Sequence, residues 1–251
     1  LAWGLGYVGQ PHILARFMAV ENAPKIRPAR RIAMVWMLIV LCGSVTTGLA
    51  GIAYFADQPL ANPETVFIVL SQSLFNPWVA GIITAAILSA IMSTIDSQLL
   101  VSSSVISEDF YRVFIKPKAS EKELLLVSRI AVVAIAVLAL FIASDRESRV
   151  LDLVSYAWAG FGAAFGPVIV FSLFWRKMTA MAAIVGMIIG AVTVVVWSNL
   201  EGGIFDLYEI VPGFVFASLA VIGISLMKPQ QGQIALQQFD EAASLLEETQ
   251  Q

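Results

Sequence analysis

The residues best suited to binding chemistry lie between Ala90 and Gln98, a polar cluster inside an apolar segment of membrane length. Ala90, Ser93 and Thr94 are spaced i, i+3 and i+4, so in a helix they share one face. Two hydroxyls and a main-chain carbonyl on that face would offer neutral oxygen atoms, which hard cations prefer as ligands. Neutral ligands suit a monovalent ion that has to bind and then leave. This face is therefore a candidate site for a small monovalent cation.

The same cluster allows a second interpretation. Serine and threonine hydroxyls also donate to carbonyls of their own helix or join neighbouring helices, and spacing alone does not separate this alternative from ion binding. Asp96 lies two residues after Thr94, on roughly the opposite side of the helix. An unpaired carboxylate in lipid costs about 3 kcal/mol on insertion scales. We therefore expect Asp96 to face water or a partner, in a structural or gating role.

A second candidate site lies at residues 1–12, where Gly4, Gly6 and Gly9 are followed by Pro11. The glycine spacing formally matches a dinucleotide-binding loop, but no strand precedes it and Pro11 stands where the phosphate-binding helix would run, which excludes that function. In a membrane, three glycines and a proline weaken a helix and free backbone groups, which is tolerated only against protein or a cavity. Secondary transporters bind substrate at such broken helices.

Two aromatic side chains accompany this break. Trp3 and Tyr7 are spaced i, i+4 on one face, and Pro11 follows a turn later. An aromatic wall beside free backbone amides suits a small zwitterion with an apolar ring. The alternative is an interfacial aromatic pair on a close-packed, glycine-rich helix.

The amino-acid composition indicates what kind of helices position these residues. Of the 251 residues, 59% are hydrophobic and 13% are charged, against about 25% charged in soluble domains. This indicates an integral protein of the lipid bilayer. No basic arm or aromatic-basic face predicts a nucleic-acid partner, and the single cysteine, Cys42, is expected to be a small apolar side chain.

Hydropathy predicts an all-α membrane protein with about seven transmembrane segments, since a span needs about 20 mainly apolar residues. A short helix over 63–72 is also expected, with Asn62 as its N-cap. The start at Leu1, inside an apolar stretch, is interpreted as a missing N-terminal part. We expect a membrane domain over 1–227 and a polar cytoplasmic tail over 228–251. The seven predicted segments are 1–18, 32–55, 74–105, 124–144, 150–175, 180–199 and 207–227.

Positive charge predicts the orientation. Thirteen of the 15 basic residues lie in or beside alternate loops near residues 25, 115 and 177, with Arg16 before the first loop and Lys228 at the start of the tail. The two exceptions are Arg146 and Arg149. Basic residues concentrate on the cytoplasmic side. These loops and the C-terminus are therefore expected to be cytoplasmic.

Small residues indicate where helices pack closely. The 156–167 run is glycine-rich and ends in Pro167, which suits either plain packing or a gating kink. Gly186 and Gly190 form a GxxxG pair, which ordinarily means helix packing. No constellation of catalytic residues is found, so an enzyme is not expected.

Four runs of the chain closely resemble the solute:sodium symporter family, in its proline-transporting branch. The resemblance extends from Leu1 to about Met227 and does not include the tail. The four runs are WGLGYVGQPHILARFM (3–18), FNPW (75–78), MSTIDSQLLVSS (92–103) and VSYAWAGFGAAFGP (154–167).

The resemblance implies a leucine-transporter type fold, built from two inverted five-helix repeats with additional helices. This chain would hold the second repeat and two C-terminal helices. Trp3, Tyr7 and Pro11 would belong to the proline site. The Ala90 carbonyl and the Ser93 and Thr94 hydroxyls would supply half of the sodium site, the other half coming from the first repeat. Asp96 matches a position that varies in the family.

The expected function is therefore sodium-coupled symport of L-proline into the cell, across the plasma membrane, by alternating access. A sodium symporter for another small solute and a membrane scaffold or sensor that moves no solute remain alternatives. The oligomeric state does not follow from the sequence.

Overall fold

The computed structural model describes residues 2–144, 149–227 and 232–248, and this part of the chain is helical, without a β-strand. Six of its helices are long and apolar enough to cross a membrane, which confirms the predicted fold class. They are α3 (Ile26–Tyr54), α5 (Pro77–Ser104) with its continuation η3 (Val105–Ile115), α6 (Glu121–Ile142), α7 (Val150–Phe174), α8 (Ala180–Trp197) and α9 (Ile210–Met227).

The predicted first segment is divided into two short helices, α1 (Ala2–Tyr7) and α2 (Pro11–Met18). Neither is long enough to count among the six spans. Gly9 N donates to Gly6 O at 3.0 Å, which turns the chain at the end of α1. The break therefore falls where the glycines and Pro11 predict it.

Two helices extend beyond their predicted ends. α3 begins at Ile26, so Arg27, Arg30 and Arg31 lie in its first turns and not in a loop. Long basic side chains can reach the interface from there, and Pro28 is tolerated near a helix start. α5 runs on past residue 105 into the π-helix η3 (Val105–Ile115). Ser103, near the end of α5, is buried.

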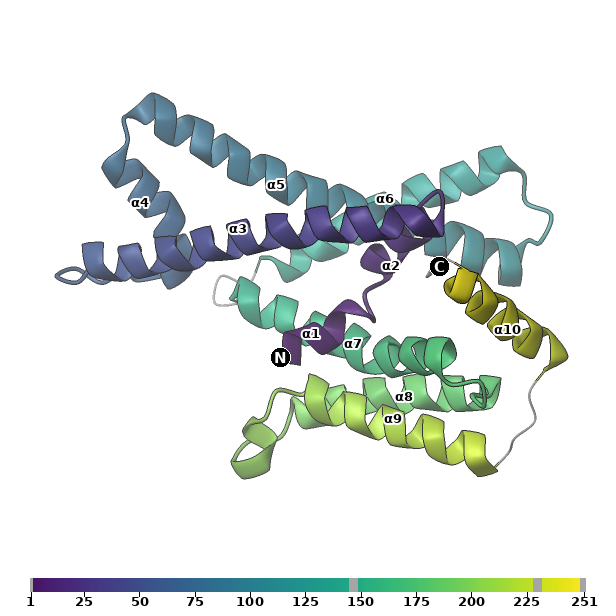
Figure 1. Ribbon diagram of the computed structural model, residues 1–251. Coiled ribbons are helices and arrows are strands. Elements are labelled where there is room, and N and C mark those ends of the chain that lie inside the picture. Colours follow the sequence, from purple (N-terminus) through teal and green to yellow (C-terminus); the bar gives the residue numbers. More distant parts are fainter. Residues whose placement is uncertain (1, 145–148, 228–231, 249–251) are drawn as a thin grey trace. The chain divides into compact units, whose positions relative to one another are not determined.

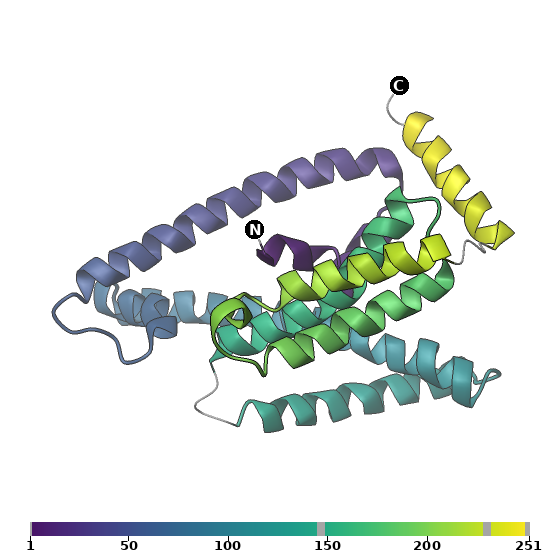
Figure 2. The same ribbon diagram turned by 90° about the horizontal axis from the view of Figure 1, so that it is seen from below.

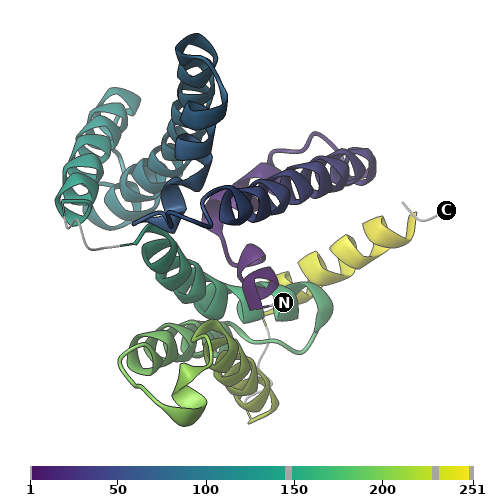
Figure 3. The same cartoon turned by 90° about the vertical axis from the view of Figure 1, so that its left-hand side faces the viewer.

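The chain divides into two compact units, one formed by Leu1–Ala19 with Val133–Gln251 and the other by Val20–Val132. In the first unit, α7, α8 and α9 pack side by side and α1 lies against α7 and α9 (Figure 1). Figures 2 and 3 show the same three-helix group from two further directions. Its core is formed by Ala159, Ala163, Val194 and Ile210.

Glycines bring these three helices together. A Cβ atom on Gly190 of α8 would lie 2.3 Å from the Ala163 carbonyl oxygen of α7, and one on Gly186 would lie 2.5 Å from the Val221 side chain of α9. The GxxxG pair therefore packs within the chain.

Thr179 caps the N-terminus of α8. Its hydroxyl oxygen accepts from Ala182 N at 3.3 Å, and its own backbone N–H donates to Ser225 Oγ at 3.2 Å.

The second unit contains α3, the short helix α4 (Val66–Leu74), α5 and η3, and α4 contacts both α3 and α5 (Figure 1). Asn62 caps the turn η2 (Pro63–Thr65) by accepting from Glu64 N, as predicted. Asn76 caps α5 in the same way, accepting from Val79 N at 3.1 Å, with Pro77 at the first position. An apolar cavity of about 520 Å³ lies among the C-terminal end of α3, the following loop and Val66.

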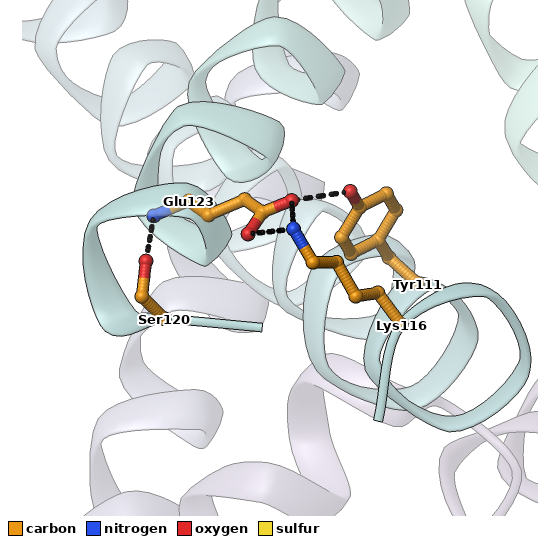
Figure 4. A network of polar contacts seen from close by, with 4 residues as sticks. All are labelled: Tyr111, Lys116, Ser120 and Glu123. Carbon is orange, nitrogen blue, oxygen red and sulfur yellow. Dashed lines mark hydrogen bonds and ion pairs between the residues drawn. The ribbon is translucent and has the colours of Figure 1, made fainter. Parts of the chain in front are cut away.

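A polar network closes the corner between η3 and α6 (Figure 4). Glu123 Oε1 accepts from Tyr111 Oη at 2.7 Å, and both Glu123 oxygens accept from Lys116 Nζ, at 2.9 and 2.8 Å. Ser120 Oγ accepts from Glu123 N at 3.4 Å, at the start of α6. This corner is therefore an ordered connection.

The tail forms the helix α10 (Gln233–Glu248). Arg176, in the α7–α8 connection, donates to Asp240 of α10 through Nε at 2.8 Å and Nη2 at 2.9 Å. The expected domain boundary at residue 228, including Lys228, and the charged loop residue Arg146 lie outside the described residues.

Candidate functional site

The first candidate site is a group of three oxygen atoms on α5. The Ser93 and Thr94 hydroxyls both donate to the Ala90 carbonyl oxygen, at 2.9 and 3.3 Å. This is the intrahelical bonding that spacing alone left open beside ion binding. The bonds direct the hydroxyl protons toward Ala90, so the free lone pairs of both hydroxyls point elsewhere.

The oxygen spacing is compatible with a shared cation. Two oxygens bound at right angles to one cation at about 2.4 Å lie about 3.4 Å apart. The Thr94–Ala90 separation of 3.3 Å is close to this value, and the Ser93–Ala90 separation of 2.9 Å is shorter. Ala90, Ser93 and Thr94 are all exposed on α5. The group can therefore form one side of a coordination shell, and further ligands must come from elsewhere.

Carboxylates are not part of this group. Asp96 is exposed on α5, two residues beyond Thr94. In the described part of the chain, no three His, Cys, Asp or Glu side chains gather where they could hold a metal ion. The site chemistry thus consists of neutral oxygens, which suit a weakly held monovalent ion better than a divalent one.

The second candidate site is built on the break between α1 and α2. The aromatic side chains of Trp3 and Tyr7 both contact Trp158 of α7, with ring centroids 5.3 and 4.9 Å apart. The Tyr7 contact is edge-to-face, a favourable geometry for aromatic rings. Trp3 and Tyr7 keep 39% and 43% of their surfaces exposed. They therefore retain apolar surface for a ligand while being fixed on one side.

Glycines allow this close approach. A Cβ atom on Gly6 would lie 1.9 Å from the Trp158 Nε1 atom, and one on Gly9 would lie 2.5 Å from the Phe161 carbonyl oxygen. A Cβ on Gly162 of α7 would in turn lie 2.7 Å from Gly6 Cα. Backbone-to-backbone contact between α1 and α7 thus requires glycine on both helices.

Pro11 lies on the other side of the break, at the first position of α2. Gln10, before it, is in an extended conformation and only 4% exposed. Its side-chain amide donates to the Trp158 carbonyl oxygen at 3.3 Å. The structure therefore brings Trp3 and Tyr7 together around one residue of α7, and it places Pro11 beside the buried Gln10.

Trp158 is the residue that the sequence did not single out. It lies inside the glycine-rich run 156–167, which indicated close packing but not which side chain would be packed. Tyr208, before α9, also reaches α7, and its hydroxyl donates to the Ser155 carbonyl oxygen at 2.7 Å. Burial, with the nearby charge of Glu209, raises the pKa of Tyr208 to about 12.

The residues of both candidate sites lie in the part of the chain that matches the model of one protein family. The model of the sodium:solute symporter family matches residues 1–190, which include α1, α2, α5 and α7. The chain belongs to the sodium:solute symporter family. Membership confirms the resemblance carried by the four sequence runs.

Several characterised members of the family are similar to nearly the whole chain. A sodium/proline symporter of Haemophilus influenzae is 53% identical over 98% of this chain and 51% of its own length. A sodium/proline symporter of Escherichia coli is 52% identical over 96% of this chain and 49% of its own length. The high-affinity proline transporter PutP of Bacillus subtilis is 49% identical over 96% and 51%.

The chain spans about half the length of these relatives. No solved structure matches it.

Proposed function

We propose that this chain is part of a symporter that couples sodium entry to the uptake of L-proline by alternating access. The observation that carries the proposal is the extent of the similarity, since relatives named sodium/proline symporter are about half identical to it over 96–98% of its length. The family model matches residues 1–190, a range that contains the residues of both candidate sites. Relatives that are transporters favour transport over catalysis or a scaffold role.

The chemistry of the two sites supports the same function. Ser93 and Thr94, with the Ala90 carbonyl, would provide neutral oxygens for sodium. Trp3 and Tyr7 would contact the apolar ring of proline, while the charged groups of the zwitterion meet backbone freed by the break before Pro11. No bond is made or broken in such a cycle, and the protein would change only its conformation.

Coupling follows from linkage. Sodium bound at Ala90, Ser93 and Thr94 would favour the outward-open state and order the proline site. By reciprocity, proline would strengthen sodium binding by the same factor. Opening to the cytoplasm would then expose Ser93, Thr94 and Asp96 to water and release the ion.

The proposed location is the plasma membrane, with the C-terminus in the cytoplasm. The basic residues of the α2–α3 region, of the η3–α6 corner and of the α7–α8 connection support this orientation, because positive charge concentrates on the cytoplasmic side. The side chains concerned include Arg27, Arg30, Lys116, Lys118 and Arg176.

Uptake of labelled proline into liposomes, driven by a sodium gradient, tests the proposal in the full-length protein. Ser93→Ala/Thr94→Ala removes two oxygen contacts to a charged ion, each worth about 1.5 kcal/mol. The sodium concentration for half-maximal uptake should therefore rise about a hundredfold.

Ser89→Ala is the matched control, because the Ser89 hydroxyl makes the same kind of bond one turn earlier in α5, to Ala85 O at 2.9 Å. It should leave the sodium dependence unchanged. If the double variant keeps the sodium dependence of the unmodified protein, the ion site lies elsewhere. If the unmodified protein takes up proline equally well without sodium, the proposed coupling is wrong.

A further inference from the structure

Trp158 of α7 contacts the broken helix on both sides of its break. Its indole Nε1–H donates to the Trp3 carbonyl oxygen at 2.9 Å, and its own carbonyl accepts from Gln10 Nε2 at 3.3 Å. Trp3 belongs to α1, whereas Gln10 immediately precedes α2. One residue of α7 therefore holds both halves of the interrupted segment.

The contacts leave Trp158 without a free polar group for a ligand. The indole N–H is the only hydrogen-bond donor of a tryptophan side chain, and here it binds backbone. The ring also contacts both Trp3 and Tyr7, with centroids 5.3 and 4.9 Å away. The polar atoms named here thus hold α1 and Gln10, and the ring contacts the aromatic pair.

The absence of a side chain at Gly6 leaves room for the Trp158 indole. Its missing Cβ would lie 1.9 Å from Nε1 and 2.3 Å from Cδ1 of Trp158. Any side chain at position 6 would displace the indole from the backbone of α1. The hydrogen bond, the two ring contacts and the glycine gap are separate observations that assign the same place to the indole.

We propose that Trp158 is a positioning residue that sets the orientation of Trp3 and Tyr7 across the α1–α2 break, and so determines the affinity for the transported solute. This inference rests on the proposed function, because it names what orients the proline site. It also gives α7 a direct connection to that site, since a shift of α7 moves the partner of both α1 and Gln10.

Trp158→Phe tests the proposal in the full-length protein, because it keeps an aromatic ring and removes the N–H donor. The expected result is a KM for proline about fivefold higher, the effect of one lost hydrogen bond, with a maximal rate of uptake that is little changed. Gly6→Ala should raise KM in the same direction, since its methyl group occupies the place of the indole.

Trp197→Phe is the matched control. Trp197 of α8 makes the same type of bond, from Nε1 to the Leu207 carbonyl oxygen at 3.0 Å, and also contacts an aromatic ring, Phe205. This control tests whether the loss of any such indole hydrogen bond in this unit is sufficient to raise the KM for proline. Equal increases of KM in Trp158→Phe and Trp197→Phe, or no increase in Trp158→Phe, would overturn the proposal.

A second readout does not depend on the solute. Gly4 of α1 has open space around a Cβ atom, so a Gly4→Cys variant in a background without other cysteines can be labelled with a maleimide. Adding Trp158→Phe should change the labelling rate several-fold, and adding Trp197→Phe should not. An unchanged labelling rate in the Trp158→Phe variant contradicts the positioning role. If Trp158→Phe changes the labelling rate but the protein with Trp158 takes up no proline, only the proposed function is contradicted.

Discussion

Single glycines determine how closely α7 and α8 approach. A Cβ atom at Gly190 would lie 2.3 Å from the Ala163 carbonyl oxygen and 3.0 Å from Ala164 Cα, both in the backbone of α7. Backbone atoms cannot move aside as a flexible side chain can. The contact therefore depends on the absence of a side chain at position 190.

Gly190→Ala should lower the free energy of unfolding by about 1–3 kcal/mol, the usual cost of overpacking a closed contact. Gly223→Ala in α9 is the control, because nothing lies within 4 Å of a Cβ atom there. The control should be neutral or raise stability by up to about 1 kcal/mol, since alanine favours a helix over glycine. Thermal unfolding in detergent compares the two. Equal stabilities of the two variants would mean that the α7–α8 contact tolerates a methyl group at position 190.

At the same scale, the sequence predicted which residues could bind but not what holds them. Trp3, Tyr7 and Pro11 were recognisable from helical spacing and from the glycines around them. Trp158 follows Trp3 by 155 residues, and its role comes from a tertiary contact. Local periodicity contains no information about such a contact. The Ser93 and Thr94 hydroxyls donate to Ala90, an alternative that spacing had already allowed.

The helix α10 is attached to the α7–α8 connection by a charge pair. The hydrogen bonds from Arg176 hold the pKa of the Asp240 carboxyl below its usual range, and Asp240 holds the pKa of Arg176 above its own. Both side chains are about half exposed. Salt therefore screens the pair.

The pair should keep α10 attached at neutral pH and release it only in acid. A lowered carboxyl pKa gives stabilisation that is present above the ordinary aspartate pKa of about 3.9. That stabilisation is lost as the pH falls through the lowered value. The protection factors of the α10 amides, which correct for the pH dependence of intrinsic exchange, should be constant from neutral to mildly acidic pH and lower at high salt.

Asp240→Asn should lower the protection at neutral and mildly acidic pH, and it should make no difference in acid below the lowered pKa of Asp240, where the pair is already lost. Glu241→Gln removes the same charge one residue further along α10 and is expected to leave the exchange slow. Fast exchange in both variants would show that the overall charge of the tail, and not the pair with Arg176, holds the helix.

Hydropathy predicted the helices well because membrane spans are set by length and apolar composition. Their ends were less predictable. Charged residues such as Arg27 and Glu108 suggested loops, yet Arg27 lies in the first turn of α3 and Glu108 lies in η3. The network of Tyr111, Lys116 and Glu123 stabilises the corner after η3, and its partners are apparent only once the chain has folded back (Figure 4).

At the scale of the whole molecule, the two candidate sites belong to different units. Trp3 and Tyr7 lie in the unit formed by the chain ends, and Ala90, Ser93 and Thr94 lie in the unit from Val20 to Val132. In the proposed symporter, coupling between them would depend on a shared conformational equilibrium that each ligand shifts by its own differential affinity.

Trp3→Ala should weaken proline binding about tenfold, as expected for the loss of a favourable aromatic contact. Sodium binding measured without proline should change little, because the proposed ion ligands lie on α5. Equilibrium binding of each ligand in the full-length protein separates the two effects. Trp36→Ala, which removes an exposed tryptophan of α3, controls for the loss of bulk. Equal weakening of both ligands by Trp3→Ala would indicate damage to the fold.

The bonds from Ser93 and Thr94 to the Ala90 carbonyl have a consequence for ion discrimination. Because both hydroxyl protons are committed to that carbonyl, this patch of α5 presents acceptors only. An anion such as chloride would meet oxygen lone pairs and no donor. An anion would therefore first have to draw one of these hydroxyl protons away from the Ala90 carbonyl, whereas a cation would meet lone pairs directly.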